Sequence, residues 1–177
     1  MTSTINVDNI NTGGGATKFL DGKPSFDVFR LSANHTSNAT ITSWERPDET
    51  TAVTNANLNG LTASSGIFTF HTTGVYHVTA CVQMENGTGA DGTMGFGVET
   101  SVNGGTDFTL AAFCSVGDTD TGANTGTATQ ILFNVTDTST HQMRFVASSL
   151  SSGSFVHGNT AYNLTSFVCN KIAPVQS

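Results

Sequence analysis

Apolar and polar residues alternate along most of the chain after residue 24, which is the pattern of strands with one buried face. Runs of this kind, bounded by glycine, asparagine or serine, lie at residues 25–31, 66–72, 75–84, 94–102, 108–116, 129–136, 142–148 and 162–172. No segment has the periodicity or the residue types of a helix. The pattern predicts an all-β fold, an antiparallel two-sheet sandwich.

The alternation also predicts which side chains form the core. Phe68 and Phe70 share one face of their run, and the next run places five residues on one face: Tyr76, Val78, Ala80, Val82 and Met84. A strong hairpin signal, Asn103-Gly104-Gly105, joins two further runs. In these two runs we expect the following residues to face inward: Met94, Phe96, Val98, Val102, Phe108, Leu110, Ala112 and Cys114.

Two segments depart from the alternation, because Ile131-Leu132-Phe133 and Phe167-Val168-Cys169 are apolar on both faces. A two-sheet sandwich normally leaves its outer faces exposed to solvent, so a second apolar face on a strand indicates that another surface covers it. In a chain without helices that cover is another copy of the chain. Four residues are therefore the candidates for a trimer interface: Ile131, Phe133, Phe167 and Val168. The alternative is a central strand covered by a loop.

Residues 1–23 differ from the rest of the chain. Ile5, Val7 and Ile10 are β-branched apolar residues in a polar segment, and Gly13-Gly14-Gly15 follows them. A short strand-like segment before a glycine run predicts an anchoring arm with a hinge. We therefore divide the chain into an arm at 1–23 and a sandwich domain at 24–177. The alternative is a frayed terminus.

Charge and composition exclude several classes of partner. The formal net charge is −7 and the six basic residues are scattered, so we expect neither nucleic acid nor an anionic membrane as a partner. The first twenty residues lack the basic and apolar regions of a signal peptide, and no apolar run is long enough to span a membrane. Cys81, Cys114 and Cys169 lie in strand-like runs, which predicts buried reduced thiols and synthesis in a cytoplasm.

Residues 61–78, LTASSGIFTFHTTGVYHV, resemble the C1q/tumour-necrosis-factor (TNF) family of jelly rolls. The shared run is a glycine, one residue and Phe-Thr before a glycine, one residue and tyrosine, here Gly66, Phe68, Thr69, Gly74 and Tyr76. Weaker likeness extends over residues 24–172, with Leu164 and Ser166 departing from the family's last strand. The resemblance implies a ten-stranded jelly roll that packs as a homotrimer. It does not imply complement activity.

The N-terminal sequence STINVDNINTGGG resembles the opening of tailed-phage virion proteins. That resemblance implies a non-enzymatic structural protein located in the virion, either a capsid decoration or cement protein or a head-fibre module. We expect the arm, through Ile5, Val7 and Ile10, to bind the major capsid protein or another virion protein. The alternative is a tail-fibre tip that binds host-surface glycan through its loops.

The sequence carries no pattern of catalytic residues, and we expect neither an enzyme nor a cofactor. The five histidines lack metal-ligand spacing, and His71 and His77 are expected to point away from the core. One weak metal candidate is the loop at Asp118 and Asp120, which places oxygens at alternate positions but lacks the distal glutamate of a calcium loop. A solvated polar loop is the alternative, and we expect no metal.

Overall fold

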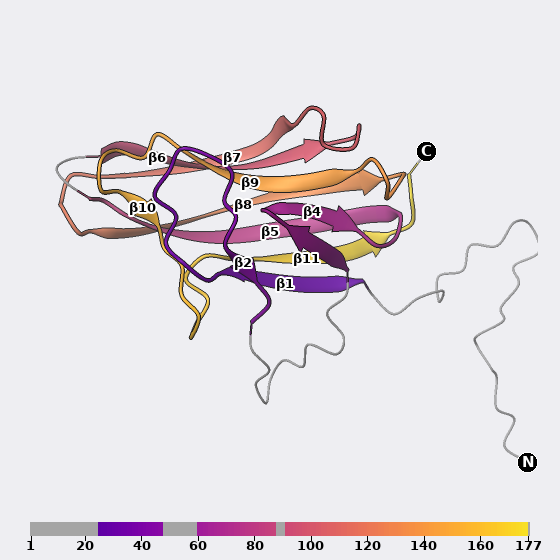
Figure 1. Ribbon diagram of the computed structural model, residues 1–177, viewed down its shortest axis with the longest axis horizontal. Coiled ribbons are helices and arrows are strands. Elements are labelled where there is room, and N and C mark those ends of the chain that lie inside the picture. Colours follow the sequence, from indigo (N-terminus) through magenta and orange to yellow (C-terminus); the bar gives the residue numbers. More distant parts are fainter. Residues whose placement is uncertain (1–24, 48–59, 88–90, 177) are drawn as a thin grey trace, which may run out of the picture.

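The computed structural model describes residues 25–47, 60–87 and 91–176, and every regular element in them is a β-strand. Figure 1 shows the strands running along the long axis of the molecule. They form two antiparallel sheets. The all-β sandwich predicted from the alternation of apolar and polar residues is confirmed. None of the described residues forms a helix long and apolar enough to cross a membrane.

Sheet A contains six strands: β1 (Phe26–Leu31), β2 (Trp44–Glu45), β5 (Gly74–Glu85), β8 (Asn124–Val135), β10 (Phe155–Val156) and β11 (Ser166–Ala173). Its order is β10-β5-β11-β1-β2, and β8 pairs with β5 along the whole length of both strands. Strand β8 is therefore one edge of this sheet. The short β2, which pairs with the end of β1, lies at the opposite edge.

Sheet B contains five strands: β3 (Leu61–Ser64), β4 (Ile67–Phe70), β6 (Asp91–Ser101), β7 (Thr109–Asp118) and β9 (Gln142–Ser148). Its order is β3-β4-β9-β6-β7, so β3 and β7 are its edges. Strands adjacent in the sheets are often distant in sequence, as where β1 pairs with β11 and β6 with β9. These pairings bring the two halves of the chain into one sandwich.

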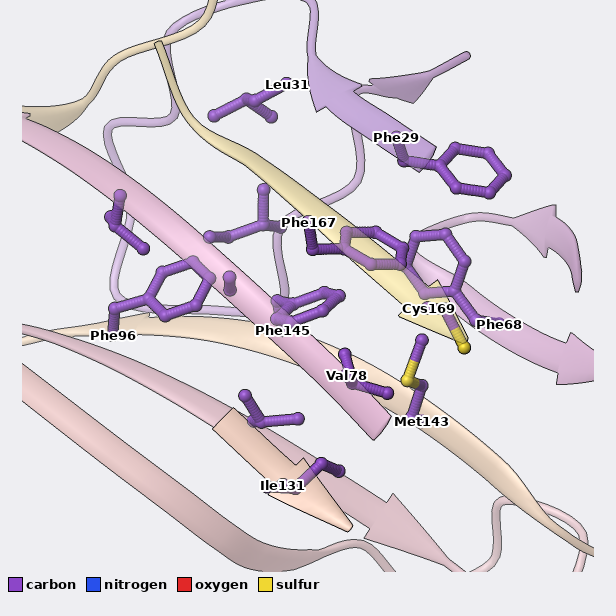
Figure 2. Close-up of a cluster of buried hydrophobic side chains, with 14 of the residues drawn as sticks. Phe29, Leu31, Phe68, Val78, Phe96, Ile131, Met143, Phe145, Phe167 and Cys169 are labelled. Carbon is purple, nitrogen blue, oxygen red and sulfur yellow. The ribbon is translucent and has the colours of Figure 1, made fainter. Parts of the chain in front are cut away.

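The core fills the space between the two sheets with aromatic rings. Phe68 from sheet B packs edge-on against Phe167 from sheet A, with ring centroids 4.9 Å apart, and Phe145 lies 4.6 Å from Phe167. Figure 2 shows Phe68, Phe145 and Phe167 among the buried apolar side chains. The predicted inward faces of residues 66–72 and 75–84 are confirmed, because Phe68, Phe70 and Tyr76 are all buried.

The tight turn between β3 and β4 explains the first glycine of the family-like run. Ser65 and Gly66 both have positive φ, 50° and 80°, as a two-residue hairpin loop requires. A Cβ on Gly66 would lie 2.3 Å from the carbonyl oxygen of Ile41. Only glycine therefore fits this turn, which sets the register of β4 and turns Phe68 inward.

Three of the predicted inward residues point outward instead. A register shift lies between Val98 and Glu99, where Val98 pairs with Ala112 but Glu99 pairs with Leu110. This β-bulge turns Leu110 outward, and the side chain is 52% exposed. Phe108 lies against the guanidinium of the outward-facing Arg144, and Val102 falls beyond the end of β6, where it is 61% exposed.

Candidate assembly surface and binding cleft

The structure corrects two of the four residues predicted for the trimer interface. Phe167 is 1% exposed and Ile131 is 8% exposed, and both side chains belong to the chain's own core. Phe133 packs against that core, with its ring 5.6 Å from the ring of Phe70. The prediction was wrong for Ile131 and Phe167, because their neighbours, Leu132 and Val168, take the outward positions. Phe133 is half-buried, so its place in the interface stays a prediction.

The outer face of sheet A is built from four long strands in register. One row across the sheet is Val28, Val168, Thr79 and Gln130. The rows on either side of it are Phe26, Asn170, His77 and Leu132, and Arg30, Ser166, Cys81 and Ala128. Leu132 is 67% exposed there. Val168 also lies on this face, so it remains a candidate for the trimer interface.

Where these rows cross β11, β5 and β8, they carry no carboxylate and no ammonium or guanidinium group. Ionic groups lie at its margins, where each has a partner. Arg30 donates to Glu45 at 2.8 Å on one side, and His157 lies 3.0 Å from the Glu85 carboxylate at the end of β5. His77 has a neutral partner, since its Nε2 lies 3.0 Å from Oε1 of Gln130. The face is therefore suited to contact with another uncharged surface.

Two long edge strands, β7 and β8, pack side by side along one flank of the sandwich. Among the described strands, each pairs with only one neighbour, β7 with β6 and β8 with β5. Neither carries a charged residue between Thr109 and Gly117 or between Asn124 and Val135. Proteins usually protect long edges with lysine, proline or a covering element. An uncharged pair of edges is a surface that another chain can cover.

A cleft of about 480 Å³ opens on the opposite flank, between the β1–β2 edge of sheet A and the β3 edge of sheet B. Eight of the described residues line it: Phe29, Trp44, Glu45, Arg46, Leu61, Thr62, Ala63 and His71. Trp44 is the only tryptophan of the chain. The sequence offered no signal for this site beyond that residue, because its members come from segments that only the sandwich brings together.

The polar side chains of the cleft form hydrogen bonds with other groups of the protein. Arg46 forms two hydrogen bonds with Asp27, Nε to Oδ1 at 2.9 Å and Nη2 to Oδ2 at 2.8 Å, and a third with the carbonyl oxygen of Leu61. The Trp44 indole donates to the carbonyl oxygen of Ile41 at 2.9 Å. On the other wall, His71 Nε2 lies 2.6 Å from the Thr62 hydroxyl. The cleft is thus pre-organised.

The three cysteines are free thiols in different environments, so the prediction of buried thiols is wrong for one of them. Cys81 is exposed on the outer face of sheet A, Cys114 is half-buried and Cys169 is buried. Burial raises the pKa of the Cys114 thiol. Burial, with the Asp27 carboxylate as a second cause, raises the pKa of the Cys169 thiol further.

The weak metal candidate, Asp118 and Asp120, lies in the turn that joins β7 to β8. Asp118 Oδ1 accepts from the backbone N–H of Asp120 at 2.9 Å, and its Oδ2 accepts from the Thr125 hydroxyl at 3.2 Å. These hydrogen bonds lower the pKa of the Asp118 carboxyl. Across residues 25–47, 60–87 and 91–176, no group of three or more potential ligands could hold a metal ion. Absence of a metal stays a prediction.

Two further predictions concern histidines and the arm. His71 is exposed, and His77 lies on the outer face of sheet A, so both point away from the core as expected. The arm residues Ile5, Val7 and Ile10, and the boundary between the arm and the domain, lie outside the described residues. The arm therefore stays a prediction.

Comparison with known proteins supports the fold independently. No protein-family model and no curated protein matches the chain. Among solved structures, the TNF protein Eiger from S. frugiperda superposes with a TM-score of 0.63 at 11% identity, over 87% of this chain and 96% of Eiger. Murine APRIL at pH 5.0 superposes with a TM-score of 0.61 at 15% identity, over 85% of this chain and 100% of APRIL.

The two sheets, their strand order and these superpositions define the class: the chain is an antiparallel jelly-roll sandwich. More narrowly, it has the TNF-like form of that fold, as the C1q/TNF-like run at residues 61–78 led us to expect.

Proposed function

We propose that this protein is a non-enzymatic structural module that assembles as a homotrimer and is displayed on a virion. The observation that carries the proposal is the uncharged part of the outer face of sheet A, on β11, β5 and β8, together with the uncharged flank formed by β7 and β8. These are different surfaces of one chain, so contact between them is heterologous. Repetition of such a contact closes a ring, and the C1q/TNF resemblance implies a ring of three.

The contact is favoured by the chemistry of both surfaces. Leu132 and Val168 on sheet A supply apolar area, and burying such area is favourable by roughly 25 cal/mol per Å². Where these rows cross β11, β5 and β8 they carry no charged group, so a contact there takes no ion out of water. In this contact the neighbouring chain covers the edges of β7 and β8, which prevents their backbone groups from pairing with strands of other molecules.

The virion part of the proposal rests on the N-terminal segment. Its likeness to tailed-phage virion proteins supports attachment of residues 1–23 to the major capsid protein or another virion protein. An extended segment can add to the edge of a partner's sheet through its backbone groups. The trimeric jelly roll would then stand outside the particle as a decoration, a cement protein or a head-fibre module.

The trimer is tested by light scattering on purified protein. The expected mass is three times 18.4 kDa. Leu132→Glu places a carboxylate in the proposed contact and should give a folded monomer. Val102→Glu is the matched control, since Val102 is 61% exposed beyond the end of β6, lies on neither contact surface and should leave the trimer intact. A monomeric wild-type protein at micromolar concentration, or equal behaviour of the two variants, refutes the contact.

The arm is tested by deletion. Protein lacking residues 1–15 should remain a folded trimer and fail to bind virions that lack this protein, as measured by co-sedimentation with the particles. Retained binding would place the attachment in the jelly roll, and a protein that no longer folds would make the arm part of the domain.

The second candidate function is a fibre-tip module that binds glycan. A specific observation favours it, namely the cleft beside Trp44.

A further inference from the structure

We propose that the cleft between the β1–β2 edge and β3 binds an uncharged saccharide, with Trp44 as its apolar floor. This inference deepens the second candidate function, and it does not rest on the trimer, because the cleft lies on the flank opposite β7 and β8. The volume of about 480 Å³ falls within the range of roughly 300–1,000 Å³ that is usual for ligand pockets.

The first argument is the aromatic floor. Trp44 is half-buried, and three buried rings hold its indole from behind: Phe145 at 5.1 Å, Phe167 at 5.3 Å and Phe68 at 6.1 Å. The indole N–H is used by Ile41, so the orientation of the ring is set before any ligand arrives. A rigid aromatic surface with an exposed part binds the apolar C–H face of a sugar ring at little entropic cost.

The second argument is the arrangement of polar groups around that floor. Glu45 and Arg46 lie on one side, and Thr62 and His71 lie on the other. Among the described residues, Asp27 and Leu61 accept from three of the five N–H donors of Arg46, which leaves two donors that a ligand could use. Carboxylate, guanidinium, hydroxyl and imidazole groups together match a ligand that both donates and accepts, as sugar hydroxyls do.

The third argument is the balance of charge, which excludes an ionic ligand. The guanidinium of Arg46 is neutralised by the buried Asp27 carboxylate, with Nη2 2.8 Å from Oδ2. The Glu45 carboxylate is neutralised by Arg30, with Nε 2.8 Å from Oε1. Each ion pair lies within the protein, so neither supplies a net charge for an acidic sugar or a cation. The favoured ligand is therefore a neutral mono- or disaccharide.

The lone tryptophan provides the assay. The intrinsic fluorescence of the full-length protein should change in a saturable way during titration with at least one of three neutral disaccharides: maltose, lactose or N,N′-diacetylchitobiose. The charged analogue 3′-sialyllactose should bind at least tenfold more weakly than lactose if lactose is the ligand. Absence of a saturable change with all three neutral sugars, confirmed by saturation-transfer NMR, overturns the proposal.

Matched variants locate the binding. His71→Ala and Thr62→Val alter exposed side chains on the cleft wall and should each weaken binding about tenfold in saturation-transfer NMR, with unchanged melting. His77→Ala changes a histidine on the outer face of sheet A and should leave binding unchanged. Equal affinity in all three variants overturns the proposed site. Light scattering on the same samples reports the trimer separately, so a failure of assembly and a failure of binding are distinguished.

Discussion

The guanidinium of Arg46 forms two hydrogen bonds with the carboxylate of Asp27, whose side chain is fully buried. Asp27 Oδ2 also accepts from the backbone N–H of Leu61 at 3.0 Å, and Arg46 Nη2 donates to the carbonyl oxygen of the same residue at 2.7 Å. One ion pair thereby ties β1, the segment after β2 and the start of β3 together. These three segments form the wall and floor of the cleft.

Arg46→Ala should destabilise the fold strongly. Without Arg46, the Asp27 carboxylate remains buried with only backbone N–H donors, and breaking a buried pair in this way costs about 3–5 kcal/mol. The free energy of unfolding, measured with urea, checks this. Arg144→Ala is the control, because the Arg144–Glu99 pair lies on the outer face of sheet B with both side chains partly exposed. That change should cost about 0–1 kcal/mol. Similar losses in the two variants would contradict the argument.

Phe68→Ala should cost about 3–5 kcal/mol, because the side chain is fully buried and its removal leaves a cavity. Its ring lies 5.1 Å from the ring of Phe29 and 5.8 Å from that of Phe145. Tyr162→Ala is the control, since Tyr162 is 60% exposed in the loop before β11 and its removal should cost about 1 kcal/mol or less. Thermal and urea unfolding measure both changes, and a nearly unchanged stability of Phe68→Ala would show that the register of β4 is wrong.

Cys81 should act as a reporter of the outer face of sheet A. It is the exposed thiol, and it lies between Ser166 and Ala128 on the proposed contact surface. Maleimide should therefore label the Leu132→Glu variant rapidly at one thiol per chain and the wild-type trimer much more slowly. Mass spectrometry identifies the labelled residue. Equally rapid labelling of Cys81 in a confirmed wild-type trimer would show that another surface makes the contact.

Stability should fall in alkali because of the Cys169 thiol. Burial raises its pKa in the folded state above the ordinary value of 9.0, so the folded protein keeps the proton that the unfolded chain loses. The stabilising contribution is complete below that ordinary value and decreases as the pH rises above it, by up to about 1.4 kcal/mol per pH unit. Urea unfolding at about pH 8 and about pH 10 measures the loss.

Cys169→Ala should reduce this alkaline loss of stability, because the variant has no buried thiol at that position to ionise on unfolding. Cys81→Ala is the control and should lose as much stability as the wild-type protein, since Cys81 is exposed. An identical loss in all three proteins would show that Cys169 does not contribute.

Much of the fold could be predicted from local pattern. Strand β5 alternates between buried and less buried residues as its sequence does, and the Gly66 turn places β4 where the C1q/TNF-like run requires it. The bulge in β7 could not be predicted, because it depends on how that strand pairs with β6. The predicted inward position of Leu110 therefore failed, while Ala112 and Cys114 pack against the core as expected.

The candidate sites depended on contacts between distant segments. Residues 44–46, 61–63 and His71 form one cleft only because β2 and β3 lie at facing edges of different sheets. The apolar segments at 131–133 and 167–169 correctly drew attention to β8 and β11. The choice of Ile131 and Phe167 as interface residues was wrong, because an alternating strand with two apolar faces does not reveal which face turns to the core.

The sequence by itself determined that the chain forms strands, and it marked the turns and most of the inward faces, because a strand's two-residue period and a turn's backbone demands are local properties. Only the tertiary structure decided that Ile131 and Phe167 are core while Leu132 and Val168 face outward. It also decided that Trp44 lines a cleft. The physical reason is that the burial of a side chain depends on which surfaces of the chain pack together. Pairing between strands from distant segments decides which surfaces those are.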